Sequence, residues 1–380
     1  MSKLYDTDYL IIGGGCAGLS LANNLSLNKS LKYKILIIEA REKYTDDRSW
    51  CFWQKSNHEL YDLVYKKWNR WSFSIKNSFK KTKESSDYSY QYIRSIDFYN
   101  YSLKNISLSK NVHIYLNNKA IKIERKKEMF LVKTNKNLFK AKYIIDTRPN
   151  KRTFSKYPLL HQCFFGKEIE IINNDLFNNN TLDLMTNMHV DKYGMIFNYI
   201  LPISKNKGLV EITRFSKNPI NKNTLKRDLN KLFNFLKIKN YNILREEFGS
   251  LPMGFIKKKE NLNLNMKKNY YIAGISSGLL RPSSGYGFQR IQDWSKECSE
   301  NINKGLSPIS LFKEKKIFKI LDKVFLEVLY SNLYLAPKLF MKIGSETSTQ
   351  DFINFMNGRY NLFSILKIIL CLPSKIFIYH

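Results

Sequence analysis

The sequence predicts an α/β protein in which a Rossmann-type dinucleotide-binding domain is joined to a second lobe of antiparallel strands and to a helical C-terminus. Three observations predict it: a glycine-rich turn near the N-terminus, a second glycine cluster near residue 280, and hairpin patterns between them. With 380 residues, of which 43% are hydrophobic, the chain can bury a core of this size.

The first elements form a βαβ unit. The apolar run YLIIGGG (9–15) predicts a strand that ends in a tight turn, and the following residues CAGLSLANNL have helical composition. The apolar run KILIIEA (34–40) then predicts a second strand.

Gly13, Gly15 and Gly18 form a GxGxxG pattern between the first strand and the helix. Such glycines permit the tight turn, the close approach of backbone to a pyrophosphate and close helix packing, and the phosphate lies on the helix N-terminus. Glu39 ends the second strand, where an acid can accept a hydrogen bond from a ribose hydroxyl. These residues predict a dinucleotide site but leave FAD and NAD open.

The middle of the chain predicts strands. The short segments HIYL, AIKIE and MFLVKT follow a polar helix candidate and suggest a small antiparallel patch, which ends in YIIDTRP (143–149). Further on, MIFNYILPI (195–203) and LVEITRF (209–215) flank the turn SKNKG and predict a hairpin of the second lobe.

Glycines return in YYIAGISSGLLRPSSGYGFQRIQDW (270–294), which contains Gly274 and Gly285. This cluster favours FAD, because in FAD enzymes of this architecture a distant glycine-bearing loop returns to the flavin. After Gly305 the apolar residues recur at helical spacing. We assign the nucleotide-binding domain to 1–60, 95–150 and 265–305, the substrate-binding lobe to 61–94 and 151–264, and a helical region, which could associate with a membrane, to 306–380.

The charge and the cysteines restrict partners and location. A net charge of +31 suits an anionic partner such as nucleic acid or a lipid surface, although lysine and asparagine are abundant throughout the chain. The five cysteines form no CxxC pair, so neither a disulfide framework nor a metal site is expected. We expect a protein on the cytoplasmic side without a leader segment, because MSKLYDTD leads directly into the first strand.

No apolar stretch has the roughly 20 residues that a membrane-spanning helix requires. The segment LFSILKIILCLPSKIFIY (362–379) comes nearest but is interrupted by lysines and a proline. It is compatible with a helix in a membrane interface and with an amphipathic helix that closes a core, and we favour the interface slightly.

The stretch DDRSWCFW (46–53) and five further segments resemble the lycopene cyclase family of flavoproteins. The other segments are DYLIIGGGCAGLSLA (8–22), YIIDTRP (143–149), LPISKNKGLVEITRF (201–215), REEFGSLPMG (245–254) and GLLRPSSGYGFQRI (278–291), and the C-terminal FINFMNGRYNLFSILKIILCLP (352–373) is similar as well. The resemblance covers nearly the whole chain in order.

The resemblance implies a glutathione-reductase-like FAD-binding fold and a lycopene β-cyclase, which closes the linear end groups of lycopene into β-ionone rings. It further implies FAD that acts in its reduced form without net redox change, with NAD(P)H as reductant, and a peripheral location on the inner face of the cell membrane. Two differences separate the chain from related flavoenzymes. Ile275 follows Gly274 where flavin hydroxylases usually have Asp, and WNRW (68–71) lacks the spacing of flavin halogenases.

Two other functions compete with this interpretation. A FAD-dependent reductase or monooxygenase that acts on an isoprenoid would share the nucleotide site. A basic nucleic-acid-binding protein would explain the charge of +31, but the glycine fingerprint argues against it.

Ring closure requires an acid that protonates a double bond and an environment that stabilises the resulting cation. The resemblance assigns the acid/base role to Glu211 in LVEIT, and burial would raise its pKa and keep it protonated. Ile212 and Thr186 stand where relatives carry a second acidic or aromatic residue and an Asp, which leaves the proton route open. Glu246 and Glu247 are further acid candidates, with ion pairs to arginine as the simpler role.

Aromatic faces stabilise a cation in an apolar cavity. Trp50, Tyr286 and Phe288 are the candidate substrate-binding rings, with Phe52 and Trp53 beside Trp50. Since DDRSWCFW follows the predicted ribose-binding strand closely, it is expected to run along the flavin, with Arg48 facing a phosphate or a carboxylate.

Overall fold

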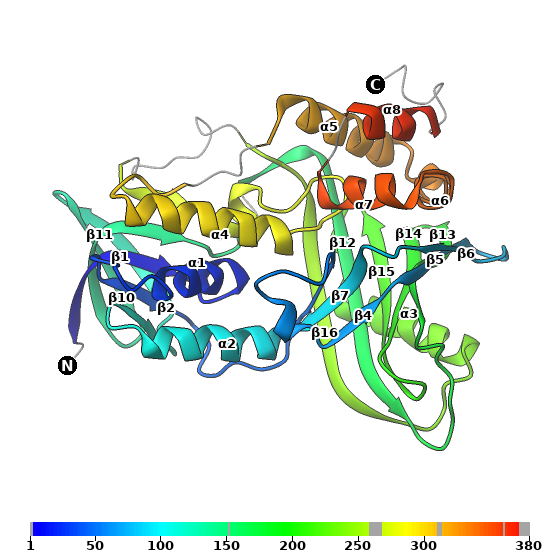
Figure 1. The fold of residues 1–380 in the computed structure, drawn as a ribbon, viewed down its shortest axis with the longest axis horizontal. Coiled ribbons are helices and arrows are strands. Elements are labelled where there is room, and N and C mark those ends of the chain that lie inside the picture. Colours follow the sequence, from blue (N-terminus) through cyan, green and yellow to red (C-terminus); the bar gives the residue numbers. More distant parts are fainter. Residues whose placement is uncertain (1–2, 151–152, 258–267, 310–313, 360–361, 372–380) are drawn as a thin grey trace.

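The computed structural model describes residues 3–150, 153–257, 268–309, 314–359 and 362–371. Within these residues the strands form two seven-stranded sheets and one three-stranded sheet (Figure 1). The first sheet, at the left of Figure 1, has helices packed on one face, and the second sheet has long strands that carry helices at one end.

The first sheet is mixed, with the strand order β8-β2-β1-β11-β10-β9 and with β17 paired to β11. Five strands are parallel neighbours: β1 (Leu4–Ile12), β2 (Ile35–Ile38), β8 (Val112–Tyr115), β11 (Leu138–Asp146) and β17 (Tyr270–Ile272). The antiparallel strands β9 (Ala120–Lys126) and β10 (Met129–Thr134) complete it.

Strand β1 is apolar on both sides because both of its faces are covered. Tyr9 and Ile11 pack in a cluster with helices α1 (Cys16–Ser26), α2 (Ser95–Leu108) and α4 (Phe288–Asn303). Leu10 and Ile12 belong to the opposite cluster, which includes residues of β10 and β11. A continuous apolar run is typical of such a doubly covered parallel strand.

One predicted pairing is wrong. The segment HIYL was expected in the antiparallel patch, but its strand β8 pairs in parallel with β2, and only β9, β10 and β11 are antiparallel neighbours. The reason is the connection: α2 and β7 precede β8, and a strand reached through a covering helix joins its sheet in the parallel direction.

The second sheet has the order β16-β12-β15-β14-β13-β5-β6. Its strands are β5 (Arg70–Ile75), β6 (Lys81–Glu84), β12 (Phe154–Ile171), β13 (Thr181–Asp191), β14 (Gly194–Pro202), β15 (Lys207–Ser216) and β16 (Tyr241–Ile256). The predicted hairpin of 195–203 and 209–215 is confirmed, because β14 and β15 pair antiparallel.

The two faces of this sheet differ in character. Val210 and Ile212 of β15 pack with Phe165 of β12 in the cluster that includes helix α3 (Lys222–Phe235). Since side chains alternate along a strand, Glu211 and Thr213 point to the opposite face, where the cavity described below lies.

The three-stranded sheet lies between the larger two and contains the aromatic stretch. It has the order β3-β7-β4, with β3 (Ser49–Gln54), β4 (Lys66–Trp68) and β7 (Ser89–Arg94), and a short 3₁₀ turn η1 (Tyr61–Leu63) precedes β4. Strand β3 alternates as well: Trp50 and Phe52 pack with the helices of the first sheet, and Trp53 joins the core of the second sheet.

Among the described residues, four helices follow α4: α5 (Lys316–Ser331), α6 (Ala336–Glu346), α7 (Thr349–Asn357) and α8 (Leu362–Cys371), with the 3₁₀ turn η5 (Leu333–Leu335) before α6. They lie over one end of the second sheet (Figure 1) and contribute residues such as Leu326, Phe340 and Phe352 to its core. Of the segment predicted for a membrane interface, α8 covers 362–371, and 372–379 lie outside the described residues.

A buried ion pair ties the second glycine cluster to these helices. Arg281 donates to Asp322 of α5 at 2.7 Å, and their side chains are 1% and 2% exposed. Ser283 donates to the same carboxylate, and Arg281 also donates to the carbonyl oxygen of Phe355 in α7.

Within the described part of the chain, no helix is long and apolar enough to cross a membrane.

Candidate active site

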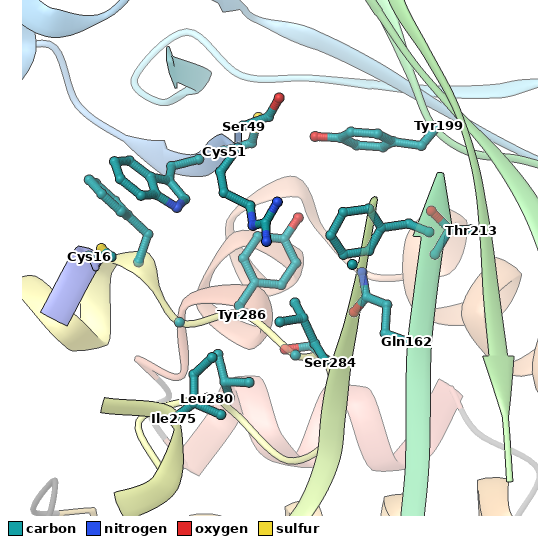
Figure 2. Close-up of a pocket in the computed structure, with 18 of the residues that line it drawn as sticks. Cys16, Ser49, Cys51, Gln162, Tyr199, Thr213, Ile275, Leu280, Ser284 and Tyr286 are labelled. Carbon is teal, nitrogen blue, oxygen red and sulfur yellow. The ribbon is translucent and has the colours of Figure 1, made fainter. Parts of the chain in front are cut away.

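A cavity of about 660 Å³ runs from the N-terminus of α1 to the inner face of the second sheet. Figure 2 shows its two sides: Cys16 lies at the start of α1, and Gln162, Tyr199 and Thr213 project from the strands opposite. The loop with Leu280, Ser284 and Tyr286 passes between the two sides. One continuous space therefore connects the glycine fingerprint with Glu211.

The glycine fingerprint forms one end of this cavity. Gly15 is the N-cap of α1, has no capping side chain, and lines the cavity with Cys16 and Ala17. Apart from its chain neighbours, no atom of the described residues lies within 4 Å of the position that a Cβ of Gly15 would occupy, whereas a Cβ at Gly18 would collide with the carbonyl oxygen of Gly13. Gly18 therefore serves helix packing, and Gly15 leaves open space in front of unpaired helix amides, which is the environment that binds a phosphate.

Glu39 lies beside the glycine turn but does not line the cavity. Its carboxylate accepts a hydrogen bond from the backbone N–H of Gly14 at 2.6 Å. It accepts three more from Arg41, through the backbone N–H at 2.8 Å, Nε at 3.1 Å and Nη2 at 3.5 Å. Arg41 does line the cavity and also donates to the carbonyl oxygen of Gly14 at 3.0 Å. The Arg41 guanidinium therefore faces the cavity just after the end of β2, and Glu39, which binds Arg41, lies outside the cavity lining.

The second glycine cluster meets the first at the same end of the cavity. Gly274 opens the 3₁₀ turn η4 (Gly274–Ser277) with φ of 72°, and a Cβ there would lie 3.3 Å from the Cβ of Ala17. Gly285, with φ of 70°, lines the cavity further along, where a Cβ would lie 2.5 Å from Oε1 of Gln162.

Two buried oxygen atoms beside Gly285 have no hydrogen-bond partner within the described part of the chain. They are Oε1 of Gln162 on β12 and Oγ of Ser284, and both residues line the cavity (Figure 2). Because a buried polar atom without a partner costs about 1–3 kcal/mol, such a pair indicates that a polar ligand group binds there. Together with the open start of α1, these atoms fit a dinucleotide whose polar ring system reaches the middle of the cavity.

The three charged residues of DDRSWCFW contact different groups. Asp46 forms an ion pair with Arg245 at 3.3 Å, and Asp47 accepts a hydrogen bond from the Tyr99 hydroxyl at 3.0 Å. Arg48 lines the cavity with 45% of its side chain exposed and donates to the backbone oxygen of Asp47 at 2.6 Å.

The three aromatic residues of this stretch also lie in different environments. Trp50 stacks on Phe288 with ring centroids 5.3 Å apart, and both rings line the cavity. Phe52 stacks on the same Phe288 at 5.1 Å, whereas Trp53 packs against Tyr90 at 4.4 Å, and neither of these two lines the cavity. The structure therefore brings Trp50 and Phe288 together at the cavity wall and places Phe52 and Trp53 in the cores.

Tyr286 belongs to a chain of three hydroxyl groups on the cavity wall. The Tyr90 hydroxyl lies 2.9 Å from the hydroxyls of both Tyr286 and Tyr199. Burial raises the pKa of all three phenols, so they stay neutral. These rings present polarisable, uncharged faces to whatever occupies the cavity.

Glu211 lies in the middle of β15 and is only 6% exposed. Burial and the neighbouring carboxylate of Glu247 raise the pKa of Glu211 well above its usual range, although the Thr213 hydroxyl, which donates to Oε1 at 2.7 Å, acts in the opposite direction. Glu211 is therefore a carboxylic acid that keeps its proton in a cavity lined largely by apolar side chains.

Glu247 lines the cavity beside Glu211 and is 4% exposed. It accepts hydrogen bonds from Arg245 at 2.9 Å and from the Ser49 hydroxyl at 2.9 Å. The expected arginine partner of this glutamate is therefore present. Its proximity to Glu211 was not predicted, because the two residues are far apart in the sequence and meet only through the pairing of β12 with β15 and β16.

The other acid candidates lie outside the cavity lining. Glu246 is within 4 Å of Lys167 and Lys222 in ion pairs of 3.8 and 3.7 Å. Asp183 pairs with Lys80 at 2.8 Å, and Thr186 is buried at 2% exposure in β13. Neither Asp183 nor Thr186 supplies a group at Glu211.

Arg41, Gln162 and Ser284 are cavity residues without a predicted role in binding or catalysis. Arg41 could have been found in the sequence, because it follows Glu39 by two positions at the end of the predicted ribose-binding strand. Among the described residues, no group of His, Cys, Asp and Glu side chains has the arrangement of a metal site.

Comparisons with known proteins agree with this geometry. The family model described as lycopene cyclase protein matches residues 8–322. None of the curated proteins matches the sequence significantly.

Solved structures share the fold at low sequence identity. A geranylgeranyl bacteriochlorophyll reductase-like protein from Thermoplasma acidophilum is 13% identical, with a TM-score of 0.62 and 98% of each chain covered. The p-nitrophenol 4-monooxygenase PnpA from Pseudomonas putida is 15% identical, with a TM-score of 0.58 and 97% of each chain covered. A mutant of the halogenase PltM in complex with FAD is 13% identical, with a TM-score of 0.57, and the similarity covers 96% of this chain and 82% of the halogenase.

Proposed function

This chain belongs to the lycopene cyclase family, and we propose that it is a lycopene β-cyclase that converts the linear ends of lycopene into β-ionone rings. The observation that carries the proposal is Glu211, a buried carboxylic acid with a raised pKa in a largely apolar cavity. A hydrocarbon substrate offers no polar group to bind, and its isomerisation requires a strong proton donor shielded from water.

The nucleotide end of the cavity is proposed to hold FAD in a glutathione-reductase-like arrangement. Gly13, Gly15 and Gly18 would form the pyrophosphate turn, Glu39 with Arg41 would hold the ribose end, and Arg48, Gly274 and Gly285 would border the rest of the cofactor. The unpartnered oxygens of Gln162 and Ser284 suit the polar edge of a flavin ring. When bound and reduced, with NAD(P)H as the reductant, the flavin would supply negative charge that stabilises a cation in this cavity.

The chain's own residues account for the remaining chemistry. Glu211 donates its proton to the terminal double bond, the next double bond attacks the resulting cation, and loss of a ring proton completes the isomerisation without net oxidation or reduction. Trp50, Tyr286 and Phe288 line the cavity with neutral rings whose faces attract a cation.

A lipid-dissolved substrate suits a peripheral membrane enzyme on the cytoplasmic side. Helix α8 exposes Phe363 and Leu366, at 76% and 56% exposure, next to Lys367. Apolar side chains beside lysines are typical of helices that lie in a membrane interface, where lysines meet anionic headgroups. The net charge of +31 fits the same surface.

Expression in lycopene-accumulating cells tests the proposal. We expect cyclised carotenes on chromatography, which also distinguishes β from ε rings and one ring from two. Unchanged lycopene in cells that contain the flavin-loaded protein would contradict the proposed function. Consumption of NAD(P)H in step with product would instead indicate the competing reductase or monooxygenase.

A further inference from the structure

We propose that Glu247 is a positioning residue that shares one proton with Glu211, and that Gly166 between them makes this carboxyl pair possible. The inference rests on the proposed function and names a second residue for the same site. The strand register, the space at Gly166 and the charges around the pair support it.

The strand register brings the two carboxyl groups together across one glycine. Gly166 of β12 is the Cα partner of Glu211 on β15 and also of Glu247 on β16. Directly paired residues point to the same face of a sheet, so Glu211, Glu247 and the bare position of Gly166 share the face of the cavity.

The space above Gly166 is already occupied by Glu211. A Cβ on Gly166 would lie 3.0 Å from Cβ and 3.3 Å from Cγ of Glu211, which is tighter than ordinary contact. The Glu211 side chain therefore leans over the glycine, on the face that Glu247 shares. The carboxyl group of Glu247 is close enough to raise the pKa of Glu211, and two neighbouring carboxyl groups of this kind can share a proton when one of them carries it.

The charges around the pair determine which group keeps the proton. Glu247 forms an ion pair with Arg245, whose guanidinium also lies 2.8 Å from Glu168 and 3.3 Å from Asp46. Glu211 has the Thr213 hydroxyl instead of a cation as its other partner. Burial and the carboxyl group of Glu247 raise the pKa of Glu211, so Glu211 is the member that keeps the proton. The titratable or charged groups near Glu211 are Glu247 and Arg245 on β16, Glu168 behind them on β12, Cys51 on β3 and Tyr199 on β14.

The pair connects the first and the last proton transfer of ring closure. In the first step the O–H bond of Glu211 breaks and a C–H bond forms at the terminal double bond of the substrate. Two carboxylates then remain side by side in a buried site. Their repulsion makes the pair a strong base. The C–H bond of the ring then breaks, its electrons form the ring double bond, and the proton returns to the pair. Proton count and oxidation state are unchanged over the cycle.

The first test is the pH profile of ring formation in lipid vesicles that contain lycopene, with the flavin-loaded wild type and Glu247→Gln. Removal of the neighbouring negative charge lowers the pKa of Glu211, so we expect activity to disappear at a pH about 1–3 units lower than in the wild type. Glu247→Asp keeps the negative charge, so its activity should disappear at the same pH as that of the wild type. Glu246→Gln, one residue away and outside the cavity, is the matched control and should leave the profile unchanged.

The second test is Gly166→Ala, with Gly208→Ala as its control. A Cβ at either position would approach a neighbour to 3.0 Å, but Gly208 is remote from the carboxyl pair and does not line the cavity. We expect Gly166→Ala to lower turnover about 10- to 100-fold while flavin content and melting temperature stay near those of Gly208→Ala.

The outcomes separate the inference from the proposed function. A wild type that forms no rings removes the proposed function and the inference with it. A wild type that forms rings while Glu247→Gln and Glu246→Gln share its pH profile would overturn the inference alone. If Gly166→Ala does not fold, the pH profiles of the Glu247 variants decide.

Discussion

The two ends of the cavity are built in different ways. The nucleotide end is made mainly by backbone: Gly13, Gly15 and Gly18 lie within one turn, and Gly274 contacts the start of the same helix. The acid end is made by side chains on three separate strands, with Glu211 and Glu247 meeting over Gly166. A backbone site follows from a short local pattern, whereas a side-chain site depends on how distant strands align.

This difference implies that the two ends can be disabled separately. Changes at the acid end should remove chemistry and leave the cofactor bound, and changes at the nucleotide end should do the reverse.

The largest effect is expected from Glu211→Gln. The amide has the size of the carboxyl group but no acidic proton, so ring formation should fall about 10²- to 10⁴-fold, the usual contribution of a general acid. Bound flavin, measured by its absorbance after purification, should equal that of the wild type. Full activity in this variant would remove Glu211 from the mechanism.

The loop that carries Gly285 connects the two ends of the cavity, and the Arg281–Asp322 ion pair anchors this loop to α5. The second-largest effect is expected from breaking this ion pair. Asp322→Asn removes the carboxylate that forms the ion pair with buried Arg281 and should lower the free energy of unfolding by about 3–5 kcal/mol. Glu84→Gln is the matched control: it removes the exposed partner of Arg70 and should cost at most about 1 kcal/mol. Denaturant unfolding measures both, and equal losses would show that the buried pair is no special anchor.

Gly15→Ala tests whether a ligand approaches the open start of α1. A methyl group at Gly15 has open space among the described residues beyond its chain neighbours, so the melting temperature should stay near the wild-type value. Flavin binding should weaken about tenfold, equivalent to ~1.4 kcal/mol, because the methyl group would occupy the path of the pyrophosphate. Gly18→Ala is the contrast: it collides with the chain itself and should lower both stability and flavin content. Unchanged flavin titration of Gly15→Ala would place the cofactor elsewhere.

The sequence predicted the nucleotide end more completely than the acid end, for a physical reason. A strand, a glycine turn and a helix are neighbours in the chain, so composition alone reveals the turn around Gly15. The alternation of LVEIT shows that Glu211 and Thr213 share a face, yet nothing local places Glu247 or Gly166 beside them. The parallel pairing of β8 was also missed, because it depends on the connection through α2 rather than on the strand's own residues.

The smallest effect is expected at Thr213. Its hydroxyl donates to Glu211 and favours the charged form, so Thr213→Val should raise the pKa of Glu211. Ring formation needs protonated Glu211, and its alkaline limb should therefore move to higher pH by less than about one unit. Thr186→Val, at a buried threonine outside the cavity lining, should leave the limb in place. A shift to lower pH in Thr213→Val would reverse the assigned sign.

The most direct test of the two-ended site is to measure bound flavin and ring formation on the same preparations of Glu211→Gln and Gly15→Ala. We predict opposite patterns: Glu211→Gln retains flavin, but its ring formation stays about 10²- to 10⁴-fold below the wild type at any FAD concentration. Gly15→Ala has less bound flavin but recovers ring formation when FAD is added in excess. Loss of flavin in Glu211→Gln, or ring formation by that variant at the wild-type rate, would contradict the account.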